Sequence, residues 1–351
     1  MAQSPVPAEL DRYRKQILFA PVGIAGQQRL QAATAVVLGC GALGSASSEM
    51  LARAGVGRLR IVDRDFVDLS NLQRQSLFTE QDVAERLPKA VAAARRLRAI
   101  NSRIEIDPLV EDAGPHNILR LIQAADIVVD GTDNFETRYL LNDAAQETRI
   151  PWVHAGCVGS VGQMMAIRPG KTACLRCVLP EPPVPGTTET CDSAGVIAPA
   201  IQIMASLQVV DVLKILTGQA DLIPPVLTIV DVWNLSLRHI NLAGVSQAQN
   251  CPCCQGTERL WLQGQRGTQS AVLCGRNSVQ LAPALSEQGS LAQLADRLRS
   301  SGEVRSNPFL VVFRPHDGEF ELTIFQDGRV IVTGTNDPAE ARSVHARYLG
   351  L

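Results

Sequence analysis

The first 150 residues alternate between short apolar runs and longer segments with helical periodicity. Residues 35–38 form an apolar run typical of a buried strand, a helix rich in small residues follows to about Gly55, and residues 59–63 predict a second strand. The alternation continues with predicted helices at 81–100, 116–125 and 134–149 and predicted strands at 103–110 and 126–130. Strands that alternate with helices predict an α/β fold with a Rossmann-like, doubly wound and mostly parallel sheet.

The pattern changes after residue 150. Extended segments interrupted by glycine run from 151 to 167, and a proline-rich loop follows at 181–186. A long helix is predicted at 196–217, and strands are predicted at 226–232 and 236–241. A long loop between regular elements is typical of a functional segment.

These changes divide the chain into four parts. They are a helical segment at 1–33, a Rossmann-like domain at 34–150, a second part of that domain at 151–256, and a C-terminal module at 257–351. In the last part, a hairpin is predicted at 320–325 and 329–332, around the turn Asp327-Gly328, before a helix at 338–348. We therefore expect a small α+β module there.

The composition of the chain limits the kinds of partner that the protein is expected to bind. With 351 residues, 46% of them hydrophobic, the chain can bury sizeable cores, and disorder is excluded. The 33 Lys and Arg residues nearly cancel the 35 Asp and Glu residues, so no overall field favours nucleic acid or an anionic membrane. Polar and small residues interrupt the uncharged runs at 30–48 and 193–210. We expect a cytoplasmic protein with no nucleic-acid or membrane partner.

A glycine-rich turn joins the first predicted strand to its helix. Gly39, Gly41 and Gly44 stand at positions one, three and six of this turn, a spacing that lets the backbone approach a phosphate chain. Asp63 ends the next strand, where a carboxylate accepts hydrogen bonds from a ribose. A tight turn with close helix packing would use the same glycines. On these residues alone, an NAD-dependent oxidoreductase fits as well as an ATP-dependent enzyme.

Charged residues beyond the ribose carboxylate separate these two activities. Arg74 and Lys89 follow Asp63 along the chain, and Asp133 follows the fourth strand. Nucleotidyl transfer builds negative charge on phosphoryl oxygens and on pyrophosphate, and Arg, Lys and Mg²⁺ stabilise this charge. Hydride transfer does not need such a group of cations. We therefore predict a nucleotidyl-transfer site in which Asp133 holds Mg²⁺. The alternatives are solvated surface charges and, for Asp133, the N-cap of the following helix.

The cysteines predict a metal site. Nine cysteines, an odd number with CxxC pairs, favour metal binding in a reducing compartment over a disulfide framework. Cys174 with Cys177, and Cys251 with Cys254, give the pattern of a tetrahedral Zn²⁺ site. Four thiolates leave no open coordination position, so the predicted zinc is structural. Redox-active dithiols are the alternative, and Cys253 is an ambiguity in the second pair.

Taken together, the ordered motifs resemble the bacterial MoeB/ThiF/HesA-like adenylyltransferases of the ubiquitin-activating-enzyme superfamily. The resemblance covers about Leu10 to Gly256. Its motifs are Arg12-Tyr13 with Gln16-Ile17, the glycine turn, Ala54-Gly55-Val56-Gly57, Ile61-Val62-Asp63-Arg64-Asp65, Asn71-Leu72-Gln73-Arg74-Gln75, Pro88-Lys89, Thr132-Asp133-Asn134, both CxxC pairs, and Thr190-Cys191 before Ala194-Gly195-Val196.

The resemblance implies ATP-dependent adenylation of the C-terminal glycine of a ubiquitin-like sulfur carrier of the ThiS or MoaD kind, with release of pyrophosphate. The pathway would be thiamine, molybdopterin or tRNA thiolation, with a cysteine desulfurase or another sulfur donor as a further partner. Asp63 would take the ribose, Arg74 and Lys89 the phosphates, and Asp133 the Mg²⁺. The residues that the motifs place at ATP and Mg²⁺ are Gly39, Gly41, Gly44, Asp63, Asp65, Asn71, Arg74, Gln75, Lys89, Asp133, Asn134 and Lys15.

Two further roles come from the resemblance alone. In relatives, an arginine at the position of Lys15 reaches ATP across a homodimer interface, so a homodimer is implied in which Lys15 or its neighbour Arg14 serves. Cys191 lies where some relatives bind the carrier covalently, as a thioester or an acyl-disulfide. The alternative for Cys191 is a small thiol packed in a loop.

The C-terminal module lacks the active-site loop of a rhodanese. Cys274 is the only cysteine after residue 256, and its neighbours do not form that loop. We therefore expect a β-β-α accessory module without sulfurtransferase activity. A non-catalytic carrier-binding scaffold is the alternative function for the whole chain, although such a subunit would be expected to have lost residues of the ATP site.

Overall fold

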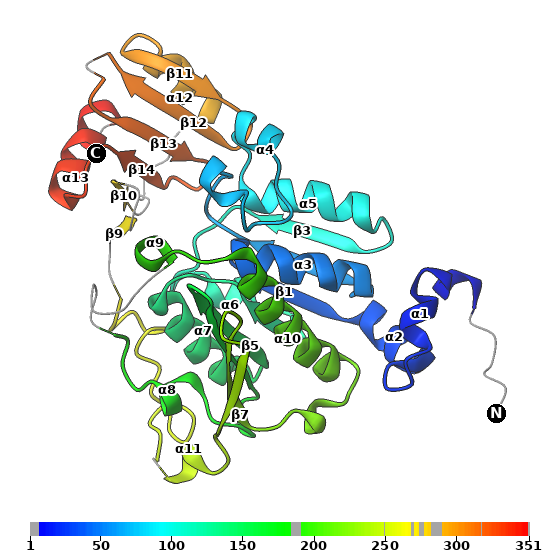
Figure 1. Ribbon diagram of the computed structural model, residues 1–351. Coiled ribbons are helices and arrows are strands. Elements are labelled where there is room, and N and C mark those ends of the chain that lie inside the picture. Colours follow the sequence, from blue (N-terminus) through cyan, green and yellow to red (C-terminus); the bar gives the residue numbers. More distant parts are fainter. Residues whose placement is uncertain are drawn as a thin grey trace. The chain divides into compact units, whose positions relative to one another are not determined.

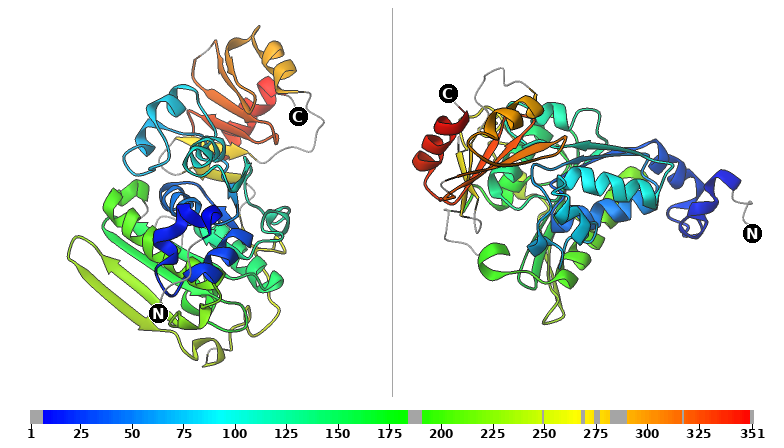
Figure 2. Two further views of the ribbon diagram at one scale, coloured as in Figure 1. Left: turned by 90° about the vertical axis from the view of Figure 1, so that its right-hand side faces the viewer. Right: turned by 90° about the horizontal axis from the view of Figure 1, so that it is seen from above.

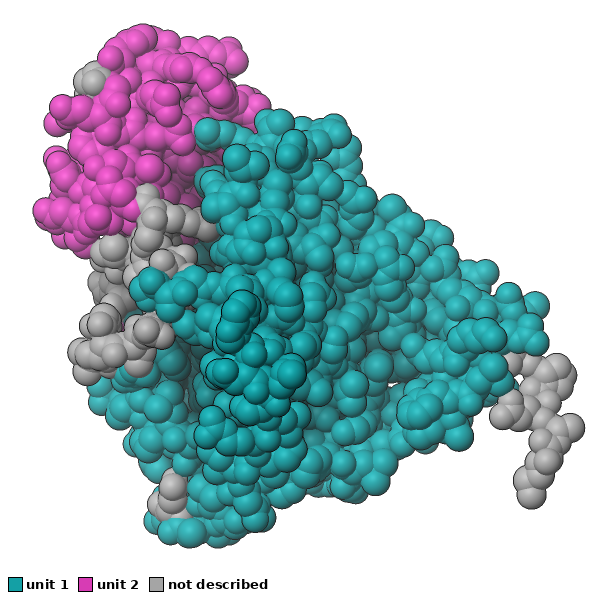
Figure 3. Space-filling model, in the orientation of Figure 1, with its two compact units in different colours: residues 1–266 teal, residues 267–351 magenta. Residues whose placement is uncertain are grey.

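The computed structural model describes residues 7–183, 191–248, 250–267, 270–273, 277–281, 290–316 and 318–349, with only the backbone at 191–192 and 270–273. Two compact units are present, residues 1–266 and 267–351 (Figure 3). Each unit has its own sheet and its own apolar core.

The first unit is built on an eight-stranded sheet in the order β3-β2-β1-β4-β5-β6-β7-β8 (Figure 1). The strands from β3 to β5 are parallel, and β6, β7 and β8 are antiparallel additions at one side. Their bounds are β1 Thr34–Leu38, β2 Arg58–Val62, β3 Glu105–Leu109, β4 Ile127–Asp130, β5 Trp152–Val158, β6 Val161–Ile167, β7 Val226–Asp231 and β8 Ser236–Asn241. The structure confirms a mixed α/β fold with a Rossmann-like, mainly parallel sheet.

Strand β1 is buried on both faces because helices cover both sides of the sheet. Ala35 and Val37 lie in the core that contains α3 (Ala42–Ala54), α5 (Lys89–Ile100) and α10 (Ala198–Leu216). Val36 and Leu38 lie in the opposite core with α6 (Ile118–Leu121) and α7 (Phe135–Thr148). The unbroken apolar run of β1 is therefore the pattern of a central parallel strand.

Helix α10 is long and apolar enough to cross a membrane by length and composition alone. It lies along α3 (Figure 1) and contributes Ile201, Met204 and Val209 to the first core. A core helix of a folded domain passes the same test of length and composition, and this packing accounts for the buried apolar residues of α10, while Ile203 and Val210 are exposed.

Two predicted helices are wrong in extent. The segment predicted as one helix at 81–100 forms α4 (Glu80–Ala84) and α5, because Pro88 is extended and lies just before α5. The helix predicted at 116–125 is only α6, since Ala124 has a positive φ of 60° that ends the helical path. The other predicted strands and helices of this unit are present, with ends shifted by at most two residues.

The remaining short elements connect this framework. Before β1 lie a 3₁₀ helix η1 (Ala8–Tyr13), α1 (Arg14–Ile17) and α2 (Gly23–Ala32), and α2 ends just before the amino end of β1. The rest are η2 (Leu69–Asn71), α8 (Leu175–Val178), α9 (Cys191–Ala194), η3 (Ala220–Leu222) and α11 (Val245–Ala248). The antiparallel hairpin of β7 and β8 extends from the side of the sheet (Figure 2).

The second unit has more strands than the sequence predicts. Its sheet has the order β11-β12-β13-β14-β10-β9, all antiparallel. The strands are β9 Ser270–Leu273, β10 Ser278–Leu281, β11 Gly302–Ser306, β12 Leu310–Pro315, β13 Glu321–Phe325 and β14 Val330–Thr333, with helices α12 Leu291–Leu298 and α13 Pro338–Leu349. The predicted hairpin is β13 with β14, and the predicted helix is α13. The predicted β-β-α module is incomplete, because the unit also contains β9 to β12 and α12. Cys274 lies outside the described residues.

Candidate functional site

The glycine turn lies where the strand order reverses, between the adjacent parallel strands β1 and β4. Gly39, just after β1, has a φ of +85°, and a Cβ added to it would lie 2.7 Å from the carbonyl oxygen of Gly131, just after β4. A Cβ added to Gly44 would lie 1.9 Å from the carbonyl oxygen of Gly39. The close approach of these three residues requires glycine, and ligands of open α/β sheets bind at this reversal point.

Asp63 organises the turn from the end of β2. Its carboxylate accepts hydrogen bonds from the backbone N–H groups of Cys40 (2.6 Å) and Asp65 (2.7 Å). Burial raises the pKa of Asp63, and the positive charge of Lys89 opposes that rise. The structure therefore brings the predicted ribose carboxylate against the predicted phosphate loop.

Lys89 begins α5 and lies buried beside Asp65. Its Nζ is 3.2 Å from Asp65 Oδ2, and the Lys89 side chain is 5% exposed. Next to this pair, Arg64 Nη1 lies 3.1 Å from Asp112 Oδ1. Although burial alone would lower it, the charges of Asp112, Asp65 and Asp133 raise the pKa of Arg64. Acidic and basic groups thus alternate along this side of the glycine turn.

The motif 71–75 follows a capped 3₁₀ turn. Asp68 and Asn71 form a capping box around η2, which fixes the path of the chain into Arg74. Arg74 is partly exposed and donates from Nη1 to the carbonyl oxygen of Ser70 (2.9 Å). Gln75 is 4% exposed, and its Oε1 is buried without a hydrogen-bond partner among the described residues. A Cβ added to Gly41 would lie 4.0 Å from Gln75 Nε2, so an unsatisfied amide lies beside the turn.

Asp133 does not cap α7, which corrects the alternative role considered above. The N-cap is Asn134, whose Oδ1 accepts from the backbone N–H of Thr137 (2.8 Å). The Asp133 side chain is exposed, and its Oδ1 lies 3.4 Å from Asn134 Nδ2. Asp133 is therefore available to a ligand, while Asn134 already has a structural role.

A buried charged network lies under this loop, and it was not predicted from the sequence. Asp130 Oδ2 lies 2.8 Å from His154 Nδ1 and 3.3 Å from Arg138 Nε, and Asp130 Oδ1 accepts from the backbone N–H of Thr132 (2.9 Å). Arg138 and His154 lower the pKa of Asp130 although burial opposes this, and burial lowers the pKa of His154. The network shapes the loop that leads to Asp133.

In the sequence, the only sign of this network is that its three charged residues lie in or next to elements that neighbour one another in the sheet. Asp130 ends β4, Arg138 follows one helical turn after the Asn134 cap, and His154 lies in β5, which neighbours β4. Gln208 of α10 adds hydrogen bonds to the carbonyl oxygens of Asp130 (2.9 Å) and Val153 (2.8 Å).

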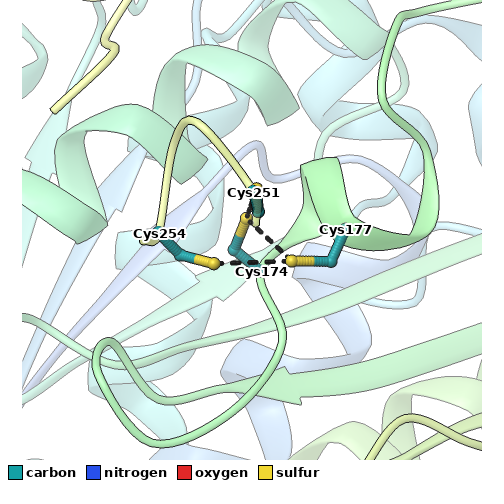
Figure 4. A group of neighbouring side chains, drawn as sticks. All are labelled: Cys174, Cys177, Cys251 and Cys254. Atoms are coloured by element: carbon teal, nitrogen blue, oxygen red, sulfur yellow. Dashed lines mark hydrogen bonds between the residues drawn. The ribbon is translucent and has the colours of Figure 1, made fainter. Parts of the chain in front are cut away.

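The two CxxC pairs meet on the α7 side of the sheet (Figure 4). The Sγ atoms of Cys174, Cys177, Cys251 and Cys254 all lie within 4.8 Å of one another, and Cys174 Sγ is 3.8 Å from both Cys177 Sγ and Cys251 Sγ. Zn–S bonds of about 2.3 Å in a tetrahedron separate the sulfurs by about 3.8 Å. The four sulfurs, which we call the cysteine cluster, could therefore hold a metal ion.

Cys253 lies beside the cysteine cluster and not within it. Its Sγ accepts from Asn142 Nδ2 (3.3 Å) and lies 3.5 Å from Asp143 Oδ1. Cys253 is fully buried. This geometry resolves the ambiguity of the second pair in favour of Cys251 with Cys254.

Two predicted site residues are not brought to the glycine turn in this chain. Lys15 and Arg14 are exposed on α1, which belongs to the helical segment before the amino end of β1, whereas Gly39 follows its carboxyl end, roughly 17 Å along a five-residue strand. Cys191 begins α9, and its side chain lies outside the described residues, as do residues 184–190 of the loop.

Comparison with known proteins is consistent with this geometry. The family model described as ThiF family matches residues 13–253. The chain is 46% identical over 340 residues to the sulfur carrier protein ThiS adenylyltransferase of Bacillus subtilis (strain 168), covering 97% of this chain and 99% of that protein. It is 37% identical over 251 residues to the sulfur carrier protein adenylyltransferase of Thermus thermophilus, covering 70% and 91% of the two chains.

Among solved structures, E. coli MccB with selenomethionine MccA matches with a TM-score of 0.59 at 25% identity, covering 68% of this chain and 74% of that one. A family match across most of the first unit, together with these relatives, establishes the relationship. The chain belongs to the ThiF family.

Proposed function

We propose that this protein is an adenylyltransferase that activates the C-terminal glycine of a ubiquitin-like sulfur carrier with ATP. The relatives named above are sulfur carrier protein adenylyltransferases, and one of them aligns along nearly the whole chain. The observation that carries the proposal is the contact of Cys40 and Asp65 N–H groups with the Asp63 carboxylate beside a glycine turn that reaches Gly131.

In the proposed reaction, a carboxylate oxygen of the carrier forms a bond to the α-phosphorus of ATP, and the bond from that phosphorus to pyrophosphate breaks. Asp63 accepts hydrogen bonds from the ribose, and the turn from Gly39 to Gly44 follows the phosphates. Gln75 places its Nε2 beside Gly41, and its Oε1, which has no hydrogen-bond partner among the described residues, could accept a hydrogen bond from the nucleotide. Arg74 stabilises negative charge as it grows on the phosphoryl oxygens and on pyrophosphate.

Asp65, Lys89 and Asp133 complete the proposed nucleotide site. Lys89, whose Nζ lies 3.2 Å from Asp65 Oδ2, would contact the phosphates, and its positive charge opposes the rise in the pKa of Asp63 that burial causes. Asp133, exposed at the start of α7, would hold Mg²⁺. When bound, Mg²⁺ neutralises charge on the phosphates and orients them. Asn71 and Asn134 hold the backbone of the two loops that carry Arg74 and Asp133.

A homodimer would complete this site. Lys15 and Arg14 are exposed at the other end of the strands, so either could reach a nucleotide only in a partner subunit. After adenylation, the Cys191 thiolate would attack the carbonyl carbon of the carrier acyl-adenylate, and the bond to AMP would break, which leaves the carrier as a thioester and releases AMP. The helix that begins at Cys191 is followed by Gly195, whose carbonyl oxygen accepts from the Gly159 N–H (2.8 Å) just after β5. A cysteine desulfurase or another donor would then supply sulfur in the cytoplasm.

The metal of the cysteine cluster is proposed to be structural Zn²⁺. The sulfur separations fit the tetrahedral geometry of that ion, and four thiolates would leave it no open position for a substrate. It would tie the segment before the loop, at Cys174 and Cys177, to the segment at Cys251 and Cys254. We propose that residues 151–256 also bind the carrier.

The test is ATP–pyrophosphate exchange by the purified protein with Mg²⁺, with and without each Gly-Gly-ended carrier of the same organism. Exchange that depends on one carrier would support adenylation and identify the pathway as thiamine, molybdopterin or tRNA thiolation. Absence of exchange with every carrier, despite carrier binding, would overturn the proposal in favour of a scaffold. Binding of NAD in place of ATP would overturn it in favour of an oxidoreductase.

A further inference from the structure

Helix α7 presents two consecutive buried polar residues to the cysteine cluster. Asn142 and Asp143 are both fully buried, in the apolar core that also contains Cys174, Cys177 and Cys251. Buried amides and carboxylates are costly unless each of their polar atoms finds a partner. The partners of these two side chains therefore indicate why polar residues are present at this depth.

The two ends of the Asn142 amide contact the two CxxC segments. Its Oδ1 accepts from the backbone N–H of Leu175 (2.9 Å), which lies between Cys174 and Cys177. Its Nδ2 donates to the Sγ of Cys253 (3.3 Å), which lies between Cys251 and Cys254. One side chain thus bridges two segments that are far apart in the sequence, and each segment is held through a residue that is not itself in the cluster.

Neighbouring contacts restrain the same segments. Asp143 Oδ2 accepts from the backbone N–H of Trp261 (3.0 Å), which follows the second CxxC pair. The Tyr139 hydroxyl donates to the carbonyl oxygen of Leu179 (2.7 Å), just after the first pair. Arg176, between Cys174 and Cys177, pairs with the partly exposed Glu258 (2.6 Å). The first two bonds hold each segment to α7 separately. The ion pair connects the two segments directly near the surface, whereas the bridge through Asn142 is fully buried.

We propose that Asn142 is a positioning residue of the zinc site, which holds both CxxC segments at the separation that the metal requires. The inference rests on the proposed zinc site and goes beyond it, because Asn142 lies outside the four ligands. Groups that orient metal ligands from the second layer of a site change metal retention by about 10- to 100-fold when they are removed. The expected result is therefore faster loss of zinc from a protein that keeps all four cysteines.

The experiment measures the rate at which the purified full chain releases zinc to an excess of a chromophoric chelator. Asn142→Ala should release zinc about 10- to 100-fold faster than the parent. Asn101→Ala is the matched control, since Asn101 is another fully buried asparagine whose Nδ2 donates to the Tyr13 hydroxyl (2.9 Å) and to the Ala52 carbonyl oxygen (2.8 Å). Asn101→Ala should lose thermal stability and release zinc at the parent rate.

A second pair of variants tests the bridge itself. Cys253→Ala removes the acceptor on the second segment and should speed zinc release. Combined with Asn142→Ala, it should give less than the product of the two single effects, because both changes break the same bond. If Asn142→Ala does not fold, Asn142→Asp replaces it in the measurement, because the carboxylate keeps an acceptor for Leu175 N–H and loses the donor to Cys253.

The outcomes separate the two proposals. A parent protein that is purified without zinc would overturn the zinc site and this inference together. Parent protein with about one zinc per chain, and Asn142 variants that release it at the parent rate, would overturn only the inference. Equal acceleration in Asn101→Ala would also overturn it, since a general loss of stability would then explain the release.

Discussion

Lys89 and Asp65 contact each other twice, through an ion pair between their partly buried side chains and through a hydrogen bond between their backbones. Lys89 Nζ lies 3.2 Å from Asp65 Oδ2, and the Lys89 N–H donates to the Asp65 carbonyl oxygen at 2.8 Å. The pair joins the segment after β2 to the start of α5, next to Asp63. A cation proposed for the phosphates is therefore also part of the structure that shapes the nucleotide site.

Replacing Lys89 should affect both stability and activity. Lys89→Met leaves Asp63 and Asp65 without their nearest buried cation, so we expect a loss of about 3 kcal/mol in the free energy of unfolding, measured by urea denaturation. Adding Asp65→Asn should restore at least half of that stability, while ATP–pyrophosphate exchange stays low. Recovery of exchange along with stability would mean that Lys89 acts only through the fold.

Arg74 and Asp133 lie on exposed loops and should affect activity without affecting the fold. Arg74→Ala or Asp133→Ala should lower carrier-dependent ATP–pyrophosphate exchange by about 100-fold or more, because Arg74 is the proposed cation at the phosphates and Asp133 the proposed ligand of Mg²⁺. Zinc content and melting temperature should match those of the parent. Arg96→Ala, a change at an exposed arginine of α5, is the control and should leave exchange unchanged. Normal exchange in both test variants would contradict the assignment of the site.

Cys191 should be needed after adenylation and not for it. Cys191→Ala is expected to keep ATP–pyrophosphate exchange within about twofold of the parent, because the thiol takes no part in the attack on the α-phosphorus. The variant should form no covalent adduct with the carrier in intact-protein mass spectrometry, whereas the parent should form one. If the parent gives no adduct under any redox condition, the thiol has no covalent role.

His154 should make stability depend on pH below neutrality. Burial lowers the pKa of His154 in the folded protein, although its bond to Asp130 opposes that shift. The unfolded chain therefore takes up a proton near pH 6.5 that the folded protein resists, so the stability linked to His154 is fully present above about pH 6.5 and falls as the pH drops below it. Arg138 and Asp130 keep their mutual contact in the same network.

The comparison of His154→Gln with the parent measures this effect. Between pH 7.5 and 5.5, the free energy of unfolding of the parent should fall more steeply than that of His154→Gln, with a difference of up to about 1.4 kcal/mol per pH unit. His116→Gln, at an exposed histidine, should keep the slope of the parent. Identical slopes for all three proteins would show that His154 does not titrate differently on folding.

Strand and helix types could be predicted from periodicity where neighbouring elements bury a regular face. The apolar run of β1, the turn from Gly39 to Gly44 and the paired cysteines each carry a local pattern, and each occurs as predicted. The break before α5 could not be read from periodicity, since 81–84 and 89–100 both have helical patterns. The positive φ of Arg86 (48°) and the extended conformation of Pro88 separate them.

The buried network of Asp130, His154 and Arg138 could not be predicted for a different reason. Its members come from β4, β5 and α7, and they meet only because β5 pairs with β4 and α7 covers both. In the second unit, β9 and β10 pair with each other, and β10 then pairs with β14, which is far away in the sequence. Contacts of this kind depend on the tertiary arrangement, and a local pattern does not encode them.

The separation of the two CxxC segments sets an order of events during synthesis of the chain. Cys174 and Cys251 are 77 residues apart, and α10, β7 and β8 lie between them. A ribosome releases the first pair while the second is not yet translated, so the early nascent chain exposes two thiols and no complete site. The parallel strands and the glycine turn can fold in that interval, whereas the cysteine cluster closes only after the last β-hairpin of the first unit has emerged. The four thiolates could capture a metal only at this late step, and a chain truncated before Cys251 would leave the ribosome with half of the cysteine cluster exposed to oxidation.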